Sequence, residues 1–214
     1  MPDVLSESEV DELLAIVSEL PDNVQIQERD MNDVKLGNPA PLGLMGFGMT
    51  TILLNIHNAG FYPISSVILA MGLFYGGLAQ VIAGILEFRK GNTFGLTAFT
   101  SYGFFWIALV FTWVLPKIGW AEATPETYMG WFLLLWGVFT FFMLLGTLKG
   151  SRVLQFVFAS LTFLFILLAI RDFSGNHGVG VLAGWVGIVC GGSAFYLAMA
   201  EVLAEQHGRK VLPF

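Results

Sequence analysis

Residues 152–171 of the chain read RVLQFVFASLTFLFILLAIR, and this stretch decides the class of fold. Between its two terminal arginines it carries no charged residue. A helix rises about 1.5 Å per residue, so about 20 apolar residues cross the roughly 30 Å of hydrocarbon in a bilayer. The stretch therefore predicts a transmembrane helix.

The rest of the chain repeats this pattern. Of its 214 residues, 56% are hydrophobic and only 12% are charged, which is far more apolar than a soluble domain of ordinary composition. Apolar stretches long enough to span a bilayer recur with short connections between them. They predict an all-α integral membrane protein with six transmembrane helices, at residues 39–58, 62–87, 94–115, 128–148, 152–171 and 178–203.

The segment before the spans is different in composition. Residues 1–36 hold most of the acidic side chains, and residues 8–20 place apolar residues on one helical stripe with acids opposite. We expect a cytosolic extension with a short amphipathic helix that packs on the body, frays or binds a partner. No basic stretch begins the chain, so a cleaved signal peptide is not expected. The six spans would form one domain over residues 37–207, followed by a cytosolic tail at 208–214.

Basic residues near the span ends predict the orientation. Lys and Arg are held on the cytoplasmic side of a membrane. Eight of the ten basic residues fall on one side of the predicted topology, and only Lys117 and Arg171 fall on the other. Both termini are therefore expected in the cytoplasm.

The first span opens with GNPAPLGL at residues 37–44, which contains the tripeptide NPA. A water channel carries this tripeptide twice, on two half-helices that meet in mid-membrane, whereas it occurs once here. The local chemistry is that of a helix start, with Asn38 as a cap and Pro39 at the first helical position. Two prolines and two glycines around one Asn exceed what a cap requires.

That string carries a resemblance. NPAPLGL followed by GFGMTTILLNIHN at 46–58 resembles the signature of the acetate uptake transporter family, the succinate-acetate permeases. The similarity continues through FYGGLAQVIAGILEFRKGNTFGLTAFTSYGFFW at 74–106, WGVFTFFMLLGTLKGSRVLQFVF at 136–158 and YLAMAEVLAEQHGR at 196–209. It covers everything after about residue 36, and the preceding residues have no counterpart in it.

The resemblance implies a fold, a function and a site. It implies six helices around a central pathway in each protomer, assembled as a homohexamer in the inner or plasma membrane, which carries acetate and in some members succinate. It also implies a hydrophobic constriction at the positions of Phe47, Tyr102 and Leu161. Ala194 matches a position that, together with the leucine, influences which monocarboxylates pass.

The residues themselves point to a pathway without fixed charge. Ionisable groups deep in a bilayer are costly and usually functional, and the spans hold almost none. Glu87 and Glu201 lie at cytoplasmic span ends and are the candidates for a proton-linked role, although Glu87 has a simpler interpretation as the partner of Lys90, three residues on. Thr97 and Ser101 belong to a polar stripe on the third span, which either lines the pathway or bonds to the helix itself.

Two amides are candidate donors to a carboxylate. Gln80 is the sole amide inside the second span, and its cost in hydrocarbon predicts that it points inward. Asn38 stands at the start of the first span, where the capped helix amides add positive potential. Polar donors without fixed charge suit a small weak acid with a methyl group.

Small residues form GxxxG pairs that let helices approach closely. They occur at Gly72 and Gly76, Gly180 and Gly184, and Gly187 and Gly191. Such pairs build either the bundle or the contact between protomers.

Energetics leave the transport mechanism open. Moving one anion inward against 100 mV costs about 2.3 kcal/mol, so accumulation of bare acetate is unfavourable. Proton symport, entry as the neutral acid and consumption inside the cell each remove the difficulty. A channel and a coupled carrier are therefore both retained, and a transport-inactive membrane sensor of the same fold is the alternative.

Other function classes find little support. The three histidines lack metal-ligand spacing, so neither a metal nor a cofactor is expected. GGSA at 191–194 faintly resembles a membrane serine protease turn, but Ser193 lies inside a continuous predicted helix. The chain is not expected to be an enzyme, and the expected partners are small carboxylates and the bilayer, not nucleic acid.

Overall fold

The computed structural model describes residues 6–19 and 36–214. The chain divides into two units, residues 1–37 and 38–214. In the first unit, helix α1 (Glu7–Ser18) confirms the predicted amphipathic helix. The Glu9 carboxylate accepts hydrogen bonds from the Ser6 hydroxyl at 2.6 Å and from the Ser6 backbone N–H at 2.7 Å. These bonds lower the pKa of Glu9, so they favour the helix start until the pH falls through that lowered pKa.

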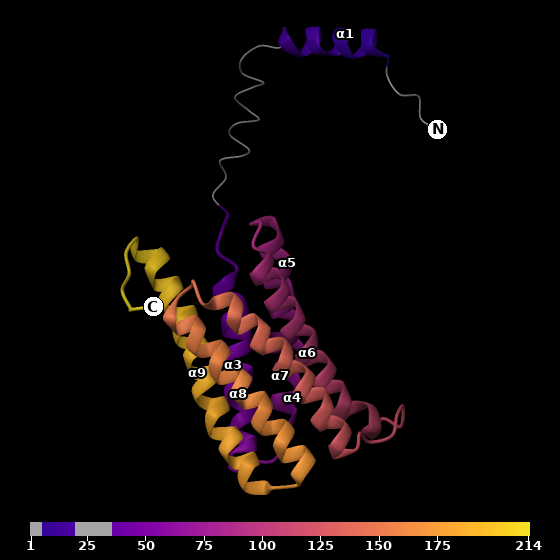
Figure 1. The fold of residues 1–214 in the computed structure, drawn as a ribbon, viewed down its shortest axis with the longest axis vertical. Coiled ribbons are helices and arrows are strands. Elements are labelled where there is room, and N and C mark those ends of the chain that lie inside the picture. Colours follow the sequence, from indigo (N-terminus) through magenta and orange to yellow (C-terminus); the bar gives the residue numbers. More distant parts are fainter. Residues whose placement is uncertain (1–5, 20–35) are drawn as a thin grey trace. The chain divides into compact units, whose positions relative to one another are not determined.

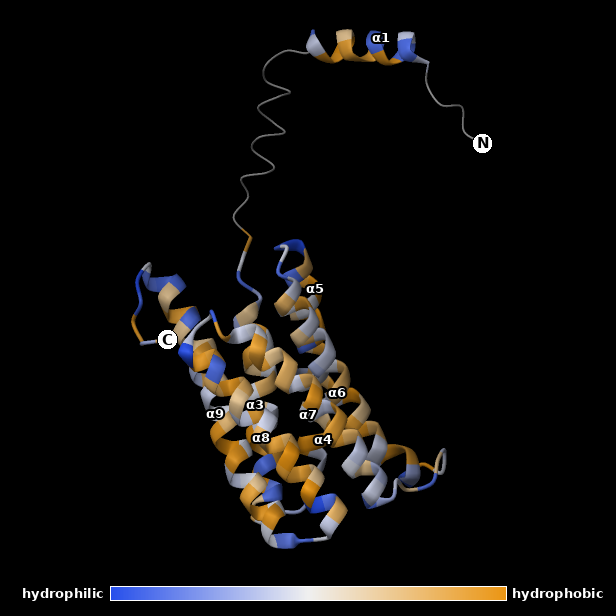
Figure 2. Cartoon of the chain, viewed as in Figure 1, coloured by the Kyte–Doolittle hydropathy of each residue, from blue (hydrophilic) through white to orange (hydrophobic). Residues whose placement is uncertain are grey.

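The second unit is a bundle of six membrane-spanning helices, as predicted (Figure 1). The spans are α3 (Ala40–Asn58), a second span Ser66–Arg89, α6 (Thr93–Lys117), α7 (Glu126–Thr147), α8 (Arg152–Ser174) and α9 (His177–His207). Apolar residues cover their length and polar residues gather at their ends (Figure 2). Large side chains such as Phe74, Leu135 and Phe142 are exposed on the bundle surface, as expected of a surface that faces lipid.

Capping residues explain where these helices begin and end. The side chains of Asn92, Ser151 and Asn176 accept bonds from the free amides at the starts of α6, α8 and α9. Gly175 and Gly208 end α8 and α9 with left-handed backbone, at φ of 64° and 63°.

The start of α3 differs from its prediction by one position. Pro39 is the cap residue and Ala40 the first helical residue, while Asn38 stands outside the helix and accepts a bond from the Ala40 N–H at 3.3 Å. The second span also starts later than predicted, at Ser66. Pro63 explains the delay, because proline disfavours helical backbone at the residue before it.

The second span is interrupted in its middle, which the sequence did not predict. It consists of α4 (Ser66–Leu73), a π-helix η1 (Phe74–Ala79) and α5 (Gln80–Arg89). Gly46 of α3 passes directly against the Tyr75 carbonyl, and Gly76 lies against Thr50. The π-helix therefore lies against α3, and α5 begins directly after it at Gln80. Such wide turns inside helices occur frequently at functional sites.

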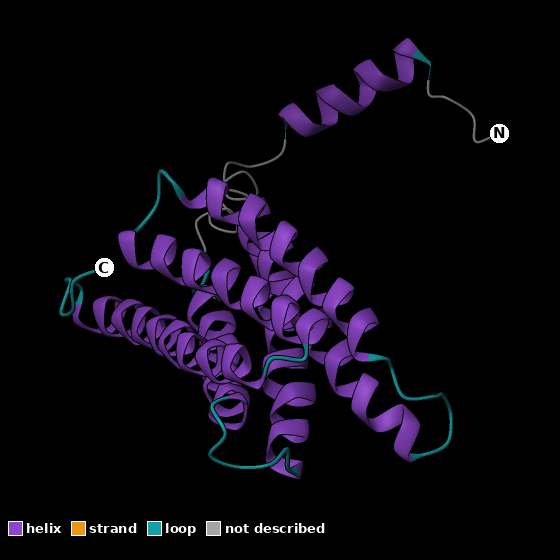
Figure 3. Ribbon diagram, turned by 60° about the horizontal axis from the view of Figure 1, so that its bottom comes forward, coloured by secondary structure: helices purple, strands orange, loops and turns teal. Residues whose placement is uncertain are grey.

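Figure 3 shows the helices of the bundle and the loops that join them. Helix α3 packs along α9, α8 lies between α7 and α9, and α5 packs on α6. Helices α6 and α7 touch one another little. They are joined by the longest connection between spans, residues 118–125.

Glycines on α9 allow its close approach to α3. Gly184 faces Ala59, Gly187 faces Asn55, and Gly191 faces the carbonyl of Gly48. A Cβ at Gly191 would stand 2.7 Å from that carbonyl oxygen and 3.0 Å from the Ile52 nitrogen. These glycines therefore build the bundle within one protomer.

We expect Gly191→Ala to destabilise the protein by about 1–3 kcal/mol, because the new methyl group meets backbone atoms that cannot move aside. Gly192→Ala is the matched control, since a Cβ there meets nothing within 4 Å. Alanine at position 192 should be neutral or slightly stabilising, because it favours the helix over glycine. Thermal unfolding in detergent measures both, and equal melting temperatures would contradict the proposed close contact.

Candidate functional site

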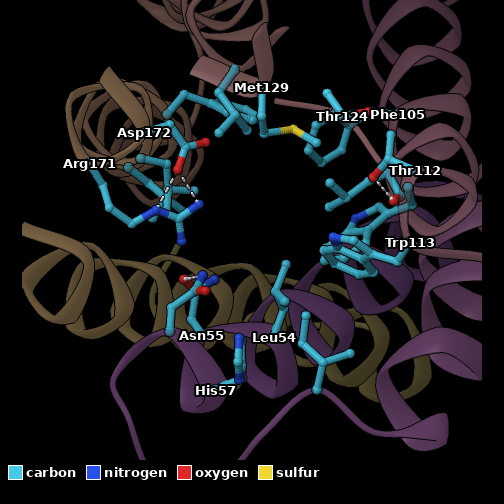
Figure 4. A pocket seen from close by; sticks show the side chains of 18 of the residues that line it. Leu54, Asn55, His57, Phe105, Thr112, Trp113, Thr124, Met129, Arg171 and Asp172 are labelled. Atoms are coloured by element: carbon cyan, nitrogen blue, oxygen red, sulfur yellow. Dashed lines mark hydrogen bonds and ion pairs between the residues drawn. The ribbon is translucent and has the colours of Figure 1, made fainter. Parts of the chain in front are cut away.

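A cavity of about 730 Å³ lies between α3, α6, α7 and α8. We call it the large cavity. It begins near His57 and His177, at one end of the bundle, and continues inward to Phe47, Tyr102 and Leu161. Figure 4 shows side chains of its lining around the open space, among them Asn55 on α3 and Trp113 on α6.

Most of the wall is apolar or aromatic, but it carries a few polar groups. The Thr51 hydroxyl and the Trp106 indole N–H are buried and, within residues 6–19 and 36–214, have no hydrogen-bond partner. Both are donors. The Asn55 amide is satisfied, because it donates to the Thr51 carbonyl at 2.8 Å and accepts from Asn58 at 3.0 Å.

Charged groups line the same cavity near the end where it begins. The Arg171 guanidinium lies against the neighbouring Asp172 carboxylate, with Nε to Oδ1 at 2.7 Å (Figure 4). Lys117 and Glu126 also line this part. The charges thus lie where water reaches the site, and the deeper wall has none.

A second cavity of about 200 Å³ lies beyond Phe47, and we call it the small cavity. It is lined by apolar side chains such as Phe94 and Phe158, and by Gln80. The lining of the large cavity and that of the small cavity share three residues and no others: Phe47, Tyr102 and Leu161. These three come from α3, α6 and α8, and the rings of Phe47 and Tyr102 lie 6.1 Å apart between centroids.

Gln80 is the polar group most enclosed in the small cavity. Its side chain is 1% exposed, and its amide oxygen has no hydrogen-bond partner in the part of the chain that the structure describes. A buried amide without partners is costly, so such a group normally binds something. The prediction that Gln80 points inward is consistent with this position.

A third cavity of about 430 Å³ opens at the opposite end of the bundle. We call it the acidic cavity, because it is lined by Glu87, Glu201 and Glu205 with Lys90 as its cation. It shares Ala40, Asn92 and Glu201 with the small cavity. The three cavities therefore follow one another through the protomer.

Hydrogen bonds in the acidic cavity connect distant parts of the chain. Lys90 Nζ donates to Asn38 Oδ1 at 3.1 Å, and Asn38 Nδ2 donates to Glu201 at 3.0 Å. The predicted pairing of Glu87 with Lys90 is wrong. Glu87 instead accepts from Asn92 Nδ2 at 2.7 Å, because the turn after α5 brings Asn92 back over the carboxylate.

The Glu87 carboxylate is only half satisfied. The side chain is 1% exposed, and its second oxygen, Oε1, has no partner among the described residues. Glu201, in contrast, is partly exposed and bonded to Asn38. Glu87 is therefore the more enclosed of the two candidates for a proton-linked role, and its free oxygen is open to a further hydrogen bond.

Three other predicted residues do not line these cavities. Thr97 is exposed on the bundle surface and Ser101 is half-buried. Each precedes by one position a residue that does line the small cavity, Ala98 or Tyr102. One residue turns a helix by about 100°, so the predicted polar stripe lies beside the cavity-facing side. Ala194 is fully buried and packs near Gly48 of α3, behind Phe47.

Several residues that line the cavities were not predicted from the sequence. Thr51 and Trp106 carry the unpartnered donors of the large cavity, and Asn92 lies between the two smaller cavities. A signal for Thr51 was present, because Phe47, Thr51 and Asn55 recur at intervals of four on one helix face. Trp106 and Asn92 had no comparable signal.

Comparisons with known proteins agree with this architecture. The model of the GPR1/FUN34/yaaH family matches residues 22–213. The succinate-acetate/proton symporter SatP of Escherichia coli is 63% identical over 183 residues, which are 86% of this chain and 97% of that protein. The ammonia transport outward protein 2 of Saccharomyces cerevisiae is 38% identical and is matched over 81% of this chain and 64% of its own length.

A solved structure, that of the bacterial acetate channel SatP, is similar in fold as well as in sequence. It has a TM-score of 0.84 and 64% identity, covering 84% of this chain and 99% of that one. SatP is thus named a succinate-acetate/proton symporter in one comparison and an acetate channel in the other. The names of these relatives place carboxylate transport first among the activities to consider.

Proposed function

The chain belongs to the GPR1/FUN34/yaaH family, and from this premise we propose that it transports acetate, and other small carboxylates, through a pathway inside each protomer. The observation that carries the proposal is the series of three cavities, of which the first two meet only at Phe47, Tyr102 and Leu161. A carboxylate would enter the large cavity, pass these three residues and leave through the acidic cavity, or move in reverse.

We propose that Phe47, Tyr102 and Leu161 form the constriction of this pathway. All three side chains are almost fully buried, so little space is left between them. Apolar side chains offer no hydrogen bonds, so a solute that passes between them loses hydrogen bonds to water. Only the polar groups on either side of the constriction can replace those bonds. Acetate suits this constriction because its methyl group has no hydrogen bonds to lose when it contacts apolar side chains.

Donors on both sides of the constriction would hold the carboxylate before and after passage. Thr51 and Trp106 belong to the lining of the large cavity, and Gln80 belongs to the lining of the small cavity. The Gln80 side chain can turn its NH₂ group toward an anion, because its amide has no fixed partner there. Asn38 lies farther on, in the acidic cavity.

We expect Leu161→Ala to widen the constriction and admit longer monocarboxylates. Discrimination of a single methylene by a tight apolar site is worth about ten-fold or more. The ratio of butyrate to acetate flux should therefore rise by at least about ten-fold, measured with labelled acids in liposomes. The matched control is Leu145→Ala on the exposed surface of α7, which should keep the wild-type ratio. An unchanged ratio in Leu161→Ala would remove Leu161 from the constriction.

We further propose that Glu87 carries a proton coupled to the carboxylate. An anion leaving the small cavity passes Glu87, Glu201 and Glu205, and Lys90 is the cation that faces them. Together with Lys90, the three carboxylates carry a negative net charge when all are ionised, and each proton that they accept weakens their repulsion of an anion. The half-satisfied Glu87 is best placed to accept a proton from the acidic cavity, and Asn92 then remains its hydrogen-bond partner.

The orientation and assembly follow the sequence argument. Arg89, Lys90, Lys149 and Arg152 lie at the span ends of the bundle face that holds the acidic cavity. Under the rule that basic residues stay inside, this face is cytoplasmic, as are both termini. We propose a multi-pass protein of the inner or plasma membrane that forms a homohexamer, with no enzymatic activity.

A further inference from the structure

The constriction depends on how the Tyr102 ring is held. The Tyr102 hydroxyl does not point along the pathway, because it donates a hydrogen bond to Thr140 Oγ1 of α7 at 2.9 Å. Thr140 in turn donates to the Trp136 carbonyl of its own helix at 2.7 Å. Thr140 is 0% exposed and does not line any of the three cavities described above.

The hydrogen bond between Tyr102 and Thr140 joins two different helices, α6 and α7. Within the described ranges no other hydrogen bond joins side chains of α6 and α7, which otherwise contact each other through aromatic rings such as those of Phe105 and Phe132. The Tyr102 ring also packs against other rings: Trp136 and Phe139 of α7 lie at centroid distances of 6.0 and 5.5 Å, and Phe47 and Phe158 lie at 6.1 and 6.2 Å. Ring contacts restrain the plane loosely, since aromatic pairs accept several geometries. The hydrogen bond fixes the end of the ring.

We propose that Thr140 is a positioning residue for substrate selectivity. It anchors Tyr102 to α7, so that one wall of the constriction stays at a fixed distance from Phe47 and Leu161. Without the anchor, the Tyr102 ring turns about its two side-chain torsions, and the constriction accepts longer carboxylates. The inference rests on the proposed function, since it assigns the selectivity of that same pathway.

Three variants test the anchor. Thr140→Val keeps the shape and removes the hydroxyl, Tyr102→Phe removes the donor, and Thr140→Ser keeps the acceptor. We expect the butyrate to acetate flux ratio to rise about two- to ten-fold in Thr140→Val and in Tyr102→Phe, the range that one buried hydrogen bond is worth. The double variant should show no further rise, and Thr140→Ser should keep the wild-type ratio.

Thr147→Val is the matched control on the same helix. Thr147 is equally buried, and its hydroxyl bonds only to the Leu144 carbonyl at 2.7 Å. The control should keep the wild-type ratio. Additive effects in the double variant, or equal effects of Thr147→Val and Thr140→Val, would overturn the inference.

A second measurement separates this inference from the proposed function. The chain has five tyrosines, so protein labelled with 3-fluorotyrosine gives few ¹⁹F resonances, and loss of one in Tyr102→Phe assigns Tyr102. Thr140→Val should shift and broaden that resonance, and Thr140→Ser should not. An unmoved resonance overturns the anchor even if acetate is transported. A moved resonance in protein without carboxylate flux supports the anchor and contradicts the proposed function.

Discussion

Replacing Gln80 by leucine is expected to lower the acetate flux by about 10- to 100-fold. One hydrogen bond to a charged group contributes about 1.5–3 kcal/mol, and Gln80 provides an amide to the lining of the small cavity. Leucine fills similar space, so the cavity keeps its shape but offers an anion no donor from this position. The variant should be at least as stable as the wild type, because a buried amide without a partner is removed.

The experiment measures labelled acetate entry into liposomes at equal protein content. Gln155→Leu is the matched control, since the Gln155 amide bonds the carbonyls of Thr147, Leu148 and Gly150 at a helix connection and lines none of the three cavities. The control should transport acetate at close to the wild-type rate. Wild-type flux in folded Gln80→Leu protein would exclude Gln80 from the pathway.

Glu87→Gln is expected to abolish accumulation of acetate that is driven by a proton gradient. With one proton per acetate, a gradient of one pH unit supports about ten-fold accumulation, because one such unit corresponds to about 1.36 kcal/mol. Glutamine has the shape of the protonated acid but cannot release a proton. The variant should therefore only equilibrate acetate, while exchange of labelled for unlabelled acetate continues.

Uptake after an imposed pH step, at fixed membrane potential and corrected for leak of acetic acid in protein-free liposomes, measures this effect. Glu122→Gln, in the connection between α6 and α7, removes an exposed carboxylate that lines none of the three cavities, and this variant should accumulate acetate normally. Accumulation by Glu87→Gln equal to that of the wild type would transfer the role to Glu201. Equilibration without accumulation in the wild type itself would indicate a channel.

The spans could be predicted because their signals are local. Residues 152–171 became Arg152–Ser174, since length and apolarity alone decide that such a segment crosses a bilayer. Boundaries shifted where backbone chemistry intervened, as at Pro63 before Ser66. The π-helix at Phe74–Ala79 could not be predicted from its own residues, because it lies where Gly46 of another helix approaches closely.

The site could be predicted only in part for the same reason. Gln80 could be identified because an amide without hydrogen-bond partners is costly in hydrocarbon. The bond between Asn38 and Glu201 could not be identified, because it joins residues 163 positions apart in the sequence. The pairing of Glu87 with Lys90 was wrong because a spacing of three residues favours contact only within a helix. Helix α5 ends at Arg89, one residue before Lys90. Thr97 and Ser101 show that a polar stripe does not identify which helix face meets the pathway.

The most direct test of the central claim is the rate of labelled acetate entry into liposomes that hold the purified protein, at fixed membrane potential. The account predicts entry that is faster than in protein-free liposomes, saturates with acetate, and falls back toward the protein-free rate in Gln80→Leu. Entry no faster than in protein-free liposomes, from folded protein, would contradict it and leave a membrane sensor of the same fold.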